Sequence, residues 1–378
     1  MLLVVVALPV QAQFTPAAAR EGEYFHHLKG KRVSLVAHAA SVSDGVHLVD
    51  RLKDFDVVSI MSPEHGFQSK EADGELVSDG QSDEGVPIIS LYGSHKKPTA
   101  EDLANVDVVV FELQDLGLRF YTYISTLAYV MEACAENDVE LIVLDRPNPF
   151  INHVDGPVLD TANCRSFIGL HPVPVAYGMT IGEYAQMVQG ERWMNDMDQL
   201  TMHVVSCGNY HREPVYPSVP PSPNLPDDQS VAMYPSLCPL EAAEVSVGRG
   251  TDRPFQLMGS PSWQVELLGD HLVTFTPRTC QASKYPPFED ELCYGVVLED
   301  VALPRAFTIQ LVYDAYQQAL GAGVGATFFN SRGFALRIGN YEVEEQLKAG
   351  WNIQEIEAQW KQEEAAFRDL IRSKYLMY

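Results

Sequence analysis

Basic residues are scarce in this 378-residue sequence. Lysine and arginine together number 26, against 51 aspartates and glutamates, which gives a formal net charge of −25 and a pI of about 4.7. Nucleic acids and anionic membrane surfaces are bound through basic patches, so this balance argues against both as partners. A membrane-spanning helix needs about 20 apolar residues, and the sequence contains no such run. An anionic small molecule would have to be held by a few local arginines.

Several catalytic and metal-binding motifs are also missing. The sequence contains no G-x-S-x-G elbow, no H-E-x-x-H pair and no G-x-x-x-x-G-K-[ST] loop. Its cysteines show no C-x-x-C spacing, so no zinc knuckle or redox motif is visible, and in a chain of this size we expect buried free thiols. No metal or cofactor is therefore predicted. The six cysteines are Cys134, Cys164, Cys207, Cys238, Cys280 and Cys293.

The first thirteen residues bear on location. A short apolar run, Leu2–Leu8, is followed by Pro9 and a small-residue ending at Ala12, although a positively charged start is missing. This pattern resembles a secretory signal, so residues 1–13 are interpreted as a signal-like segment. We therefore expect export to the periplasm or the extracellular space, with association with the cell envelope left open. The His26-His27 pair that follows is expected to lie on the surface.

Apolar runs alternate with helical patterns in the first part of the chain. Continuous apolar runs of this kind are typical of strands that are covered on both faces. Helices are expected around residues 46–53, after Thr99 as N-cap, and over 124–136. Strands that alternate with helices imply right-handed βαβ units and a parallel sheet, hence an α/β protein. The predicted strands cover residues 33–37, 57–61, 86–91, 108–111 and 140–144.

The pattern changes after a proline-rich segment. Residues 213–226 contain six prolines and can form neither a helix nor a central strand, so they mark the expected domain boundary. Before it, Thr180 and Glu183 have the spacing of a helix capping box. After it, helices are expected over 311–320 and 353–376. The sequence thus divides into residues 20–226 and 227–378.

Polar side chains follow three of the predicted strands directly. Because the carboxyl ends of parallel strands meet at one edge of a sheet, where ligands bind in open α/β folds, we expect these side chains to share one crevice. A structural alternative is an ion pair between Asp115 and Arg119, with tyrosines between two domains. The side chains concerned are Glu64 and His65, then Glu112, Asp115, Arg119, Tyr121 and Tyr123, then Asp145, Arg146 and Asn148.

This combination of residues suits glycoside hydrolysis. One carboxyl with a raised pKa protonates the leaving oxygen, and a second carboxylate or a group on the substrate supports the positive centre. Glu64 is the first candidate for the acid, because a turn at the end of a strand would fix it. The alternative is that it only accepts backbone hydrogen bonds in that turn. Asp115, Glu112 and Glu241 are candidates for the second carboxylate, which the sequence does not rank.

Binding residues follow from the same chemistry. Tyrosines offer apolar faces to sugar rings, and asparagines can hydrogen-bond hydroxyl or acetamido groups. The candidate substrate-binding residues are His65, Arg119, Tyr121, Tyr123, Asp145, Arg146, Asn148, Asn224 and Arg249.

Seven short blocks, taken in order, resemble those of a known bacterial family. That family, long catalogued as a domain of unknown function, contains the NamZ-type exo-β-N-acetylmuramidases, and the similarity covers nearly the whole chain after residue 13. The blocks are PEHGF (63–67), SLYG (90–93), QDLGLRFYTY (114–123), LDRPNP (144–149), GMTIGE (178–183), PPSPN (220–224) and GRGT with PF (248–251, 254–255).

The resemblance implies a fold and an activity. It implies a Rossmann-like catalytic domain over residues 20–226, a smaller α+β auxiliary domain over 227–378, and an active-site cleft between them. It also implies release of N-acetylmuramic acid from non-reducing ends of peptidoglycan fragments, with the glutamate of PEHG, Glu64, as catalytic residue. The lactyl carboxylate of muramic acid is an anion that Arg119, Arg146 or Arg249 could pair with.

The sequence departs from the family pattern at three places. Glu112 stands where an aspartate is usual, residues 150–153 replace a glycine pair, and Val247 replaces an acidic residue. These changes leave two alternatives open. One is a non-catalytic envelope protein that binds muropeptides, and the other is an N-acetylhexosaminidase of different specificity.

Overall fold

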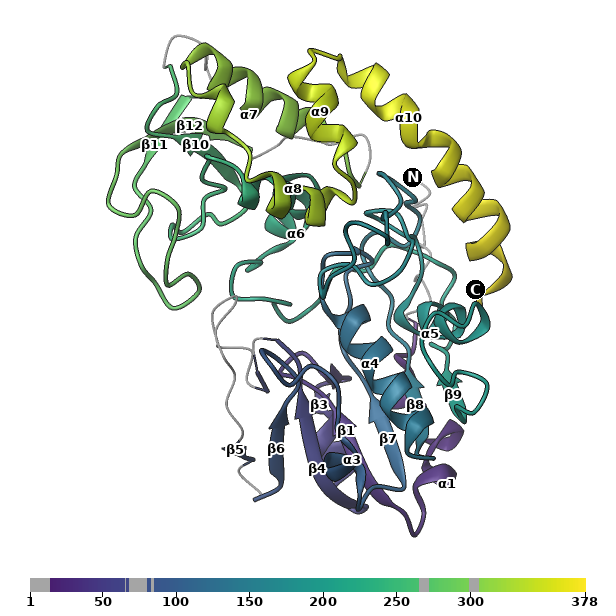
Figure 1. Cartoon of the computed structure of the whole chain (residues 1–378). Helices are drawn as coiled ribbons and strands as arrows, with labels where there is room; N and C mark the ends of the chain where they lie inside the picture. The colour runs from purple at the N-terminus through teal and green to yellow at the C-terminus, as the bar shows by residue number, and fades with distance from the viewer. Residues whose placement is uncertain (1–13, 65, 68–79, 83–84, 265–271, 299–305) are drawn as a thin grey trace, which may run out of the picture.

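A seven-stranded sheet forms the centre of the first part of the chain (Figure 1). The computed structural model describes residues 14–64, 66–67, 80–82, 85–264, 272–298 and 306–378. All five predicted strands are confirmed, and two short strands, β5 and β9, extend the sheet at its edges. The strands are β1 (Arg32–Val36), β4 (Asp56–Ser62), β5 (Gly80–Gln81), β6 (Pro87–Ser90), β7 (Val108–Phe111), β8 (Glu140–Leu144) and β9 (Met202–Val205).

The sheet is parallel except at one edge, which confirms the α/β class. Its strand order is β5-β6-β4-β1-β7-β8-β9, and only β5 pairs in the antiparallel sense. The chain proceeds from β1 through β4 to β6 on one side, then crosses to β7, β8 and β9 on the other. The strand order therefore reverses beside β1, and the carboxyl ends of the parallel strands lie along one edge.

Strand β7 illustrates why the apolar runs are continuous. Val108 and Val110 belong to the core on one face of the sheet, and Val109 and Phe111 to the core on the other. All four side chains are fully buried. Both faces are covered, so each position needs an apolar side chain. The covering helices include α4 (Tyr123–Glu136) and α5 (Ile181–Gly190) on one face, and α1 (Phe25–Leu28) and α2 (Leu48–Arg51) on the other.

Capping residues determine where several helices begin. Thr99 and Thr180 each form a capping box, at the start of α3 (Ala100–Leu103) and α5, as predicted. The helix expected over 46–53 is shorter than predicted, because β3 (Val46–His47) pairs with β2 (Val42–Ser43). The His47 side chain then accepts a hydrogen bond from Val49 N, and α2 starts only at Leu48.

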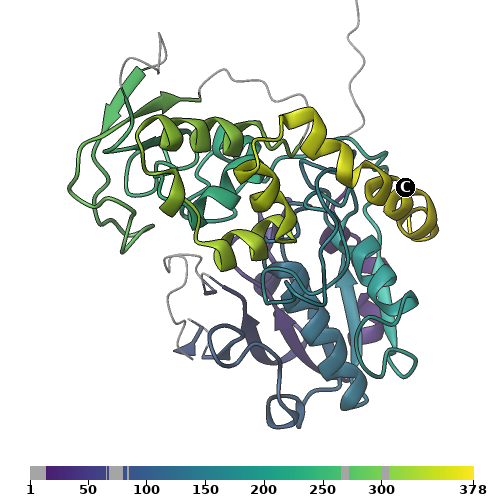
Figure 2. The same ribbon diagram turned by 45° about the horizontal axis from the view of Figure 1, so that its top comes forward.

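The second part of the chain is built from helices and a small sheet, seen from two sides in Figures 1 and 2. Residues 213–226 form no helix and no strand, as predicted. Three antiparallel strands, in the order β10-β12-β11, follow that segment, and none of them was predicted. The elements are α6 (Asp228–Leu237), β10 (Leu257–Ser260), β11 (Leu272–Phe275), β12 (Cys293–Val297), α7 (Gln310–Gly321), α8 (Ser331–Ile338), α9 (Glu342–Lys348) and α10 (Ile353–Ala366).

The last helix returns the chain to the first part of the molecule. Helix α10 continues directly into a π-helix at Phe367–Ile371 and a 3₁₀ turn at Arg372–Lys374, which confirms a helical segment over nearly all of the predicted residues 353–376. Arg372 Nε then donates to Gly178 O at 2.7 Å, and Lys374 pairs with Glu191 beside α5. Figure 1 shows α10 running along the outside of the molecule toward α5. This segment ties the two parts of the chain together.

The cysteines and the helix lengths agree with the sequence interpretation. All six cysteines are free thiols, and five of them are buried, with Cys280 exposed. None of the described helices combines the length and the apolar character that crossing a membrane requires.

Candidate active site

A pocket of about 250 Å³ lies between the sheet and the second part of the chain. One wall comes from the first part, where Glu64 follows β4 and residues 120–123 lead into α4. The other wall comes from Glu241, Arg249 and Arg337. Aromatic side chains complete the lining, and a pocket of this composition can hold a sugar ring through its apolar face. They are Tyr92, Phe120, Tyr121, Tyr123, Phe167, Tyr234 and Phe255.

Glu64 sits in a tight turn at the end of β4. Gly66 N donates to Pro63 O at 3.0 Å, and the φ of Gly66 is 72°, a value that favours glycine. The turn is thus closed by its own backbone. The Glu64 side chain is 7% exposed, and Thr122 Oγ1 donates to its Oε2 at 2.8 Å. Among the described residues this hydroxyl is its hydrogen-bond partner.

Two neutral tyrosines stand beside this carboxyl. The rings of Tyr121 and Tyr123 pack edge to face with centroids 4.7 Å apart. Tyr121 Oη donates to Pro221 O at 2.7 Å, which holds the proline-rich segment against the site. Burial raises the pKa of both phenols well above the ordinary value. Both hydroxyls therefore stay protonated at any physiological pH.

The opposite wall carries two arginines and one glutamate. Glu241 lies in the 3₁₀ turn η3 (Cys238–Ala242), and Arg249 Nη1 donates to its Oε1 at 2.6 Å. Arg337, in the last turn of α8, brings its Nε to 3.7 Å from Glu241 Oε2. Two guanidinium groups thus share one carboxylate. Guanidinium groups in a pocket lining can pair with an anionic group on a ligand.

Asn224 adds a buried acceptor to the pocket lining. Its Nδ2 donates to Ala282 O at 2.8 Å, which fixes the orientation of the amide. Its Oδ1 is buried and has no hydrogen-bond partner among the described residues. A buried acceptor without a partner costs free energy, so a ligand N–H or O–H would be favoured there.

Glu112 and Arg146 pair with each other outside the pocket lining. Arg146 Nε donates to Glu112 Oε1, and its Nη1 donates to Gln114 Oε1 at 3.1 Å. Its Nη2 donates to Val42 O at 2.8 Å. Arg146 therefore joins the segments that follow β7 and β8 to β2, and its donors are used within the protein.

Arg119 is enclosed and serves the backbone. Its two terminal nitrogens donate to four carbonyl oxygens at 2.8–2.9 Å, which belong to Pro157, Val173, Arg337 and Ile338. The side chain is fully buried, and burial lowers its pKa to about 10. The approach requires Gly339, whose φ is 112° and where a Cβ would lie 2.7 Å from Arg119 Nη2. Arg119 thus anchors the end of α8 and does not line the pocket.

Asp115 does not pair with Arg119. Its Oδ2 accepts hydrogen bonds from Tyr177 Oη and, at 2.8 Å, from Gly117 N. Burial raises the pKa of this carboxyl to about 6, although both hydrogen bonds oppose the shift. The alternative of an ion pair between Asp115 and Arg119 is therefore wrong, because the two side chains bond to different partners.

Asp145 and Asn148 are also structural. Asp145 accepts from Gly182 N at 2.7 Å and from Tyr378 Oη at 2.6 Å, and burial raises its pKa to about 7. Asn148 Nδ2 donates to Met179 O at 2.9 Å, while its Oδ1 accepts from Phe150 N at 3.0 Å. Neither residue lines the pocket, since the segment after β8 is covered by the chain that leads into α5.

The structure therefore brings together part of the predicted set. His65 lies outside the described residues. Arg337 was missed, because it lies on a helix in the second part of the chain and no motif marks it. Those that line the pocket are Glu64, Tyr121, Tyr123, Asn224, Glu241 and Arg249, and those placed elsewhere are Glu112, Asp115, Arg119, Asp145, Arg146 and Asn148.

Comparisons with known proteins cover most of the chain. Two family models match, described as the N-terminal and C-terminal parts of the exo-β-N-acetylmuramidase NamZ, over residues 33–229 and 232–378. The peptidoglycan β-N-acetylmuramidase NamZ of Bacillus subtilis (strain 168) is 35% identical over 94% of this chain and 89% of its own length.

Two crystal structures have the same fold. Both are DUF1343 family proteins from Bacteroides fragilis NCTC 9343, and each comparison covers 97% of this chain and 99% of the other. One is 36% identical with a TM-score of 0.86, and the other is 29% identical with a TM-score of 0.84.

Proposed function

The chain belongs to the exo-β-N-acetylmuramidase NamZ family of glycoside hydrolases, and we propose that it releases N-acetylmuramic acid from non-reducing ends of peptidoglycan fragments with Glu64 as the proton donor. The observation that carries the assignment of Glu64 is its setting. It is a nearly buried carboxyl in the pocket lining whose partner among the described residues is a neutral hydroxyl. A carboxyl held at the pocket lining in this way is placed to reach the leaving oxygen of a bound sugar.

The proposed chemical step uses that proton directly. Glu64 transfers its proton to the glycosidic oxygen as the bond from the anomeric carbon to that oxygen breaks, and the sugar passes through an oxocarbenium-like state. Water then supplies the hydroxyl group of the released sugar and returns a proton. Tyr121 and Tyr123 line the same pocket and pack against each other, so their rings limit the space open to bulk water beside the carboxyl.

Glu241 is the proposed second carboxylate. Of the three candidates from the sequence it is the one in the pocket lining, because Glu112 is held by Arg146 and Asp115 by Tyr177. Arg249 and Arg337 both lie within ion-pairing distance of it. A fixed negative charge in the same pocket as the acid can support positive charge at the anomeric carbon.

The arginines and Asn224 account for the choice of sugar. N-acetylmuramic acid carries a lactyl carboxylate, and we assign its recognition to Arg249 and Arg337, the two guanidinium groups that line the pocket. The acetamido N–H is assigned to Asn224 Oδ1, the buried acceptor. In a protein with a net charge of −25, such a local cationic wall is needed to hold an anion.

We also propose that the central sheet is Rossmann-like. Along the chain, the six parallel strands have the order 3-2-1-4-5-6, which is that of a Rossmann-like doubly wound sheet. Ligands in such sheets bind outside the carboxyl ends of the strands, where the strand order reverses. We assign the active-site cleft to this position, with the smaller α+β part of the chain as its second wall.

We separately propose that the protein is exported to the periplasm or the extracellular space. This proposal rests on the signal-like residues 1–13, which lie outside the described part of the structure, and on a substrate that belongs to the cell wall. Fractionation of cells that express the chain with and without residues 1–13 tests it. Equal distributions of the two forms would contradict export through this segment.

The decisive experiment on activity compares Glu64→Gln with the wild type on a chromogenic N-acetylmuramide. The variant is expected to lose activity by about 10²–10⁴-fold with an unchanged Tm, because an amide has no proton to give. Glu101→Gln, at an exposed position in α3, is the control and should be fully active. Near wild-type turnover by Glu64→Gln would overturn the assignment, and equal turnover of the matching glucosaminide would overturn the choice of sugar.

A further inference from the structure

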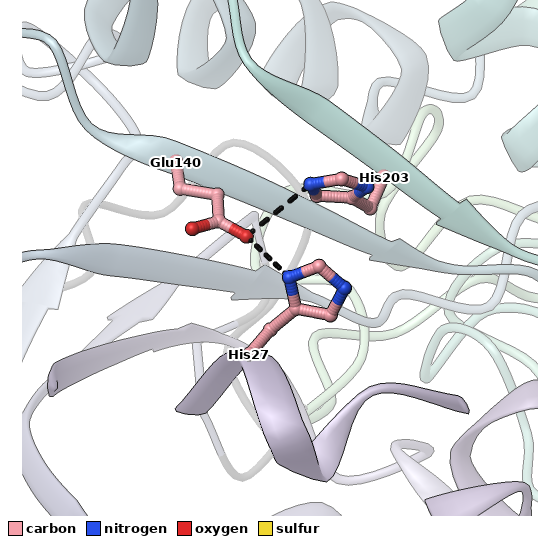
Figure 3. A group of neighbouring side chains, drawn as sticks. All are labelled: His27, Glu140 and His203. Atoms are coloured by element: carbon pink, nitrogen blue, oxygen red, sulfur yellow. Dashed lines mark hydrogen bonds and ion pairs between the residues drawn. The ribbon is translucent and has the colours of Figure 1, made fainter. Parts of the chain in front are cut away.

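Two histidines and a glutamate meet at the edge of the sheet remote from the pocket (Figure 3). His27 comes from α1, Glu140 is the first residue of β8, and His203 is the second residue of β9. The pocket follows the carboxyl ends of the strands, whereas these residues lie at the amino ends of β8 and β9. This cluster is therefore separate from the proposed catalytic machinery.

The spacing of the three donor atoms is close to that of a metal site. Glu140 Oε1 lies 2.9 Å from His27 Nδ1 and 3.4 Å from His203 Nε2. All three atoms lie within 4.8 Å of one another. Tetrahedral zinc holds nitrogen and oxygen ligands at about 2.0–2.1 Å, which places ligand atoms about 3.3 Å apart. Small side-chain movements would bring the three atoms to that spacing.

The chemistry of the donors points to a transition metal. Imidazole nitrogens combined with one carboxylate oxygen form a ligand set that Zn²⁺ commonly uses, and hard cations such as Mg²⁺ prefer oxygen ligands. Lys31 Nζ donates to the other oxygen, Glu140 Oε2. That contact leaves Oε1 for the ion, although the Lys31 ammonium group competes with an ion for the charge of the carboxylate.

The cluster is accessible to an ion from solution. The side chain of His203 is 43% exposed, while that of Glu140 is 14% exposed. The His27 and His203 rings face each other with centroids 4.2 Å apart, and Figure 3 shows both rings directed toward the carboxylate. Among the described residues, this is the one group of three such ligand atoms with this spacing.

We propose that His27, Glu140 and His203 form a binding site for a single divalent transition-metal ion, with Zn²⁺ as the best fit. The three ligands come from residues far apart in the chain, so the ion would join α1 to strands β8 and β9. Its role is structural, because an ion there strengthens the attachment of the first helix to the sheet. Such linkage to folding is typical of protein-bound zinc.

The test titrates the full chain, without a polyhistidine tag and freed of metal by a chelator, with ZnCl₂ against a chromophoric competitor. We expect one ion per chain and a rise in Tm on binding. His203→Ala and His27→Ala are each expected to weaken binding by at least about 100-fold, since even the loss of an outer partner costs about 10–100-fold. His211→Ala, at an exposed histidine outside the cluster, is the matched control and should bind as the wild type does.

Two further measurements make the outcome decisive. Lys31→Met should bind Zn²⁺ more tightly, because an ammonium group no longer competes for the carboxylate charge. Co²⁺ in place of Zn²⁺ should give visible absorption bands with the wild type but not with His203→Ala. Because the His203 side chain is exposed, we expect this variant to fold normally. No stoichiometric binding by the wild type, or full binding by the His27→Ala/His203→Ala double variant, would overturn the proposal.

Discussion

The hydroxyl of Thr122 donates a 2.8 Å hydrogen bond to Oε2 of Glu64. The two residues follow different strands, β7 and β4, which lie on either side of β1 in the sheet. The segment that follows β7 thus orients the proposed proton donor, which follows β4 on the other side of β1. Thr122 is a positioning residue in this arrangement.

Removing this hydroxyl tests its role. Thr122→Val keeps the shape of the side chain but deletes the donor, so kcat on a chromogenic muramide should fall about five- to tenfold, the equivalent of about 1–1.4 kcal/mol. KM and Tm should change little, and the pH profile of kcat should shift. Thr122→Ser, which restores the donor, should recover most of the activity. A fully active Thr122→Val would mean that the hydrogen bond has no part in catalysis.

Arg249 is expected to act on the lactyl group of the substrate. Arg249→Met should raise KM for the muramide about 10–100-fold, because a hydrogen bond to a charged group contributes about 1.5–3 kcal/mol. A matched glucosaminide, which lacks the lactyl carboxylate, should lose much less. Arg192→Met, at a surface ion pair with Asp198, serves as the control. Equal losses on the two substrates would contradict recognition of the carboxylate.

Arg119 should matter for stability, since its donors are used by the backbone. Arg119→Met leaves four carbonyl oxygens in a buried region without their donors, so the free energy of unfolding should fall by about 3 kcal/mol or more. Urea denaturation measures the change. Arg368→Met, which removes an exposed pair with Asp369, should cost less than about 1 kcal/mol. Similar small effects for both variants would contradict a structural role for Arg119.

Asp145 should make stability depend on pH. Its carboxyl has a pKa of about 7 in the folded protein, against 3.8 as the ordinary value. Between these pH values the unfolded chain releases the proton while the folded protein keeps it. Stability from this group is therefore complete below about pH 4 and is lost as the pH rises through 7.

The variant that removes this titration is Asp145→Asn. From pH 4 to pH 7 the wild type should lose about 2–4 kcal/mol more of its free energy of unfolding than Asp145→Asn does. Urea denaturation at each pH measures both values. Asp198→Asn, which changes an exposed carboxylate, should follow the wild type. Parallel curves for Asp145→Asn and the wild type would show that the carboxyl is ionised in the folded protein.

The central sheet was predictable because its strands are covered on both faces. Buried parallel strands require apolar residues at every position, as in Val108–Phe111, and such runs are visible in a sequence. Strand β9 was missed because His203 interrupts its apolar run at an edge of the sheet. Strand β11 has alternating exposure over four residues, which is too short a pattern to separate from a loop.

The site was only partly predictable, for two physical reasons. Arg337 lines the pocket because of the way α8 packs in the folded protein. No motif around Arg337 in the sequence indicates this position. Arg119 and Asp145 have the same polar character as binding residues, but they satisfy buried backbone groups, which sequence letters do not show. Glu64 was identified from the sequence because it lies in a turn at the end of a predicted strand. Glu241 was among only three candidates for the second carboxylate.

The two walls of the pocket belong to different matched regions, with Glu64 within residues 33–229 and Arg337 within residues 232–378. A sugar that touches both walls acts as a non-covalent clamp, because it must be released before the regions can separate. Saturating ligand should therefore merge their thermal unfolding into one cooperative transition. Inhibitors that bridge both walls would gain residence time that compounds confined to one wall could not.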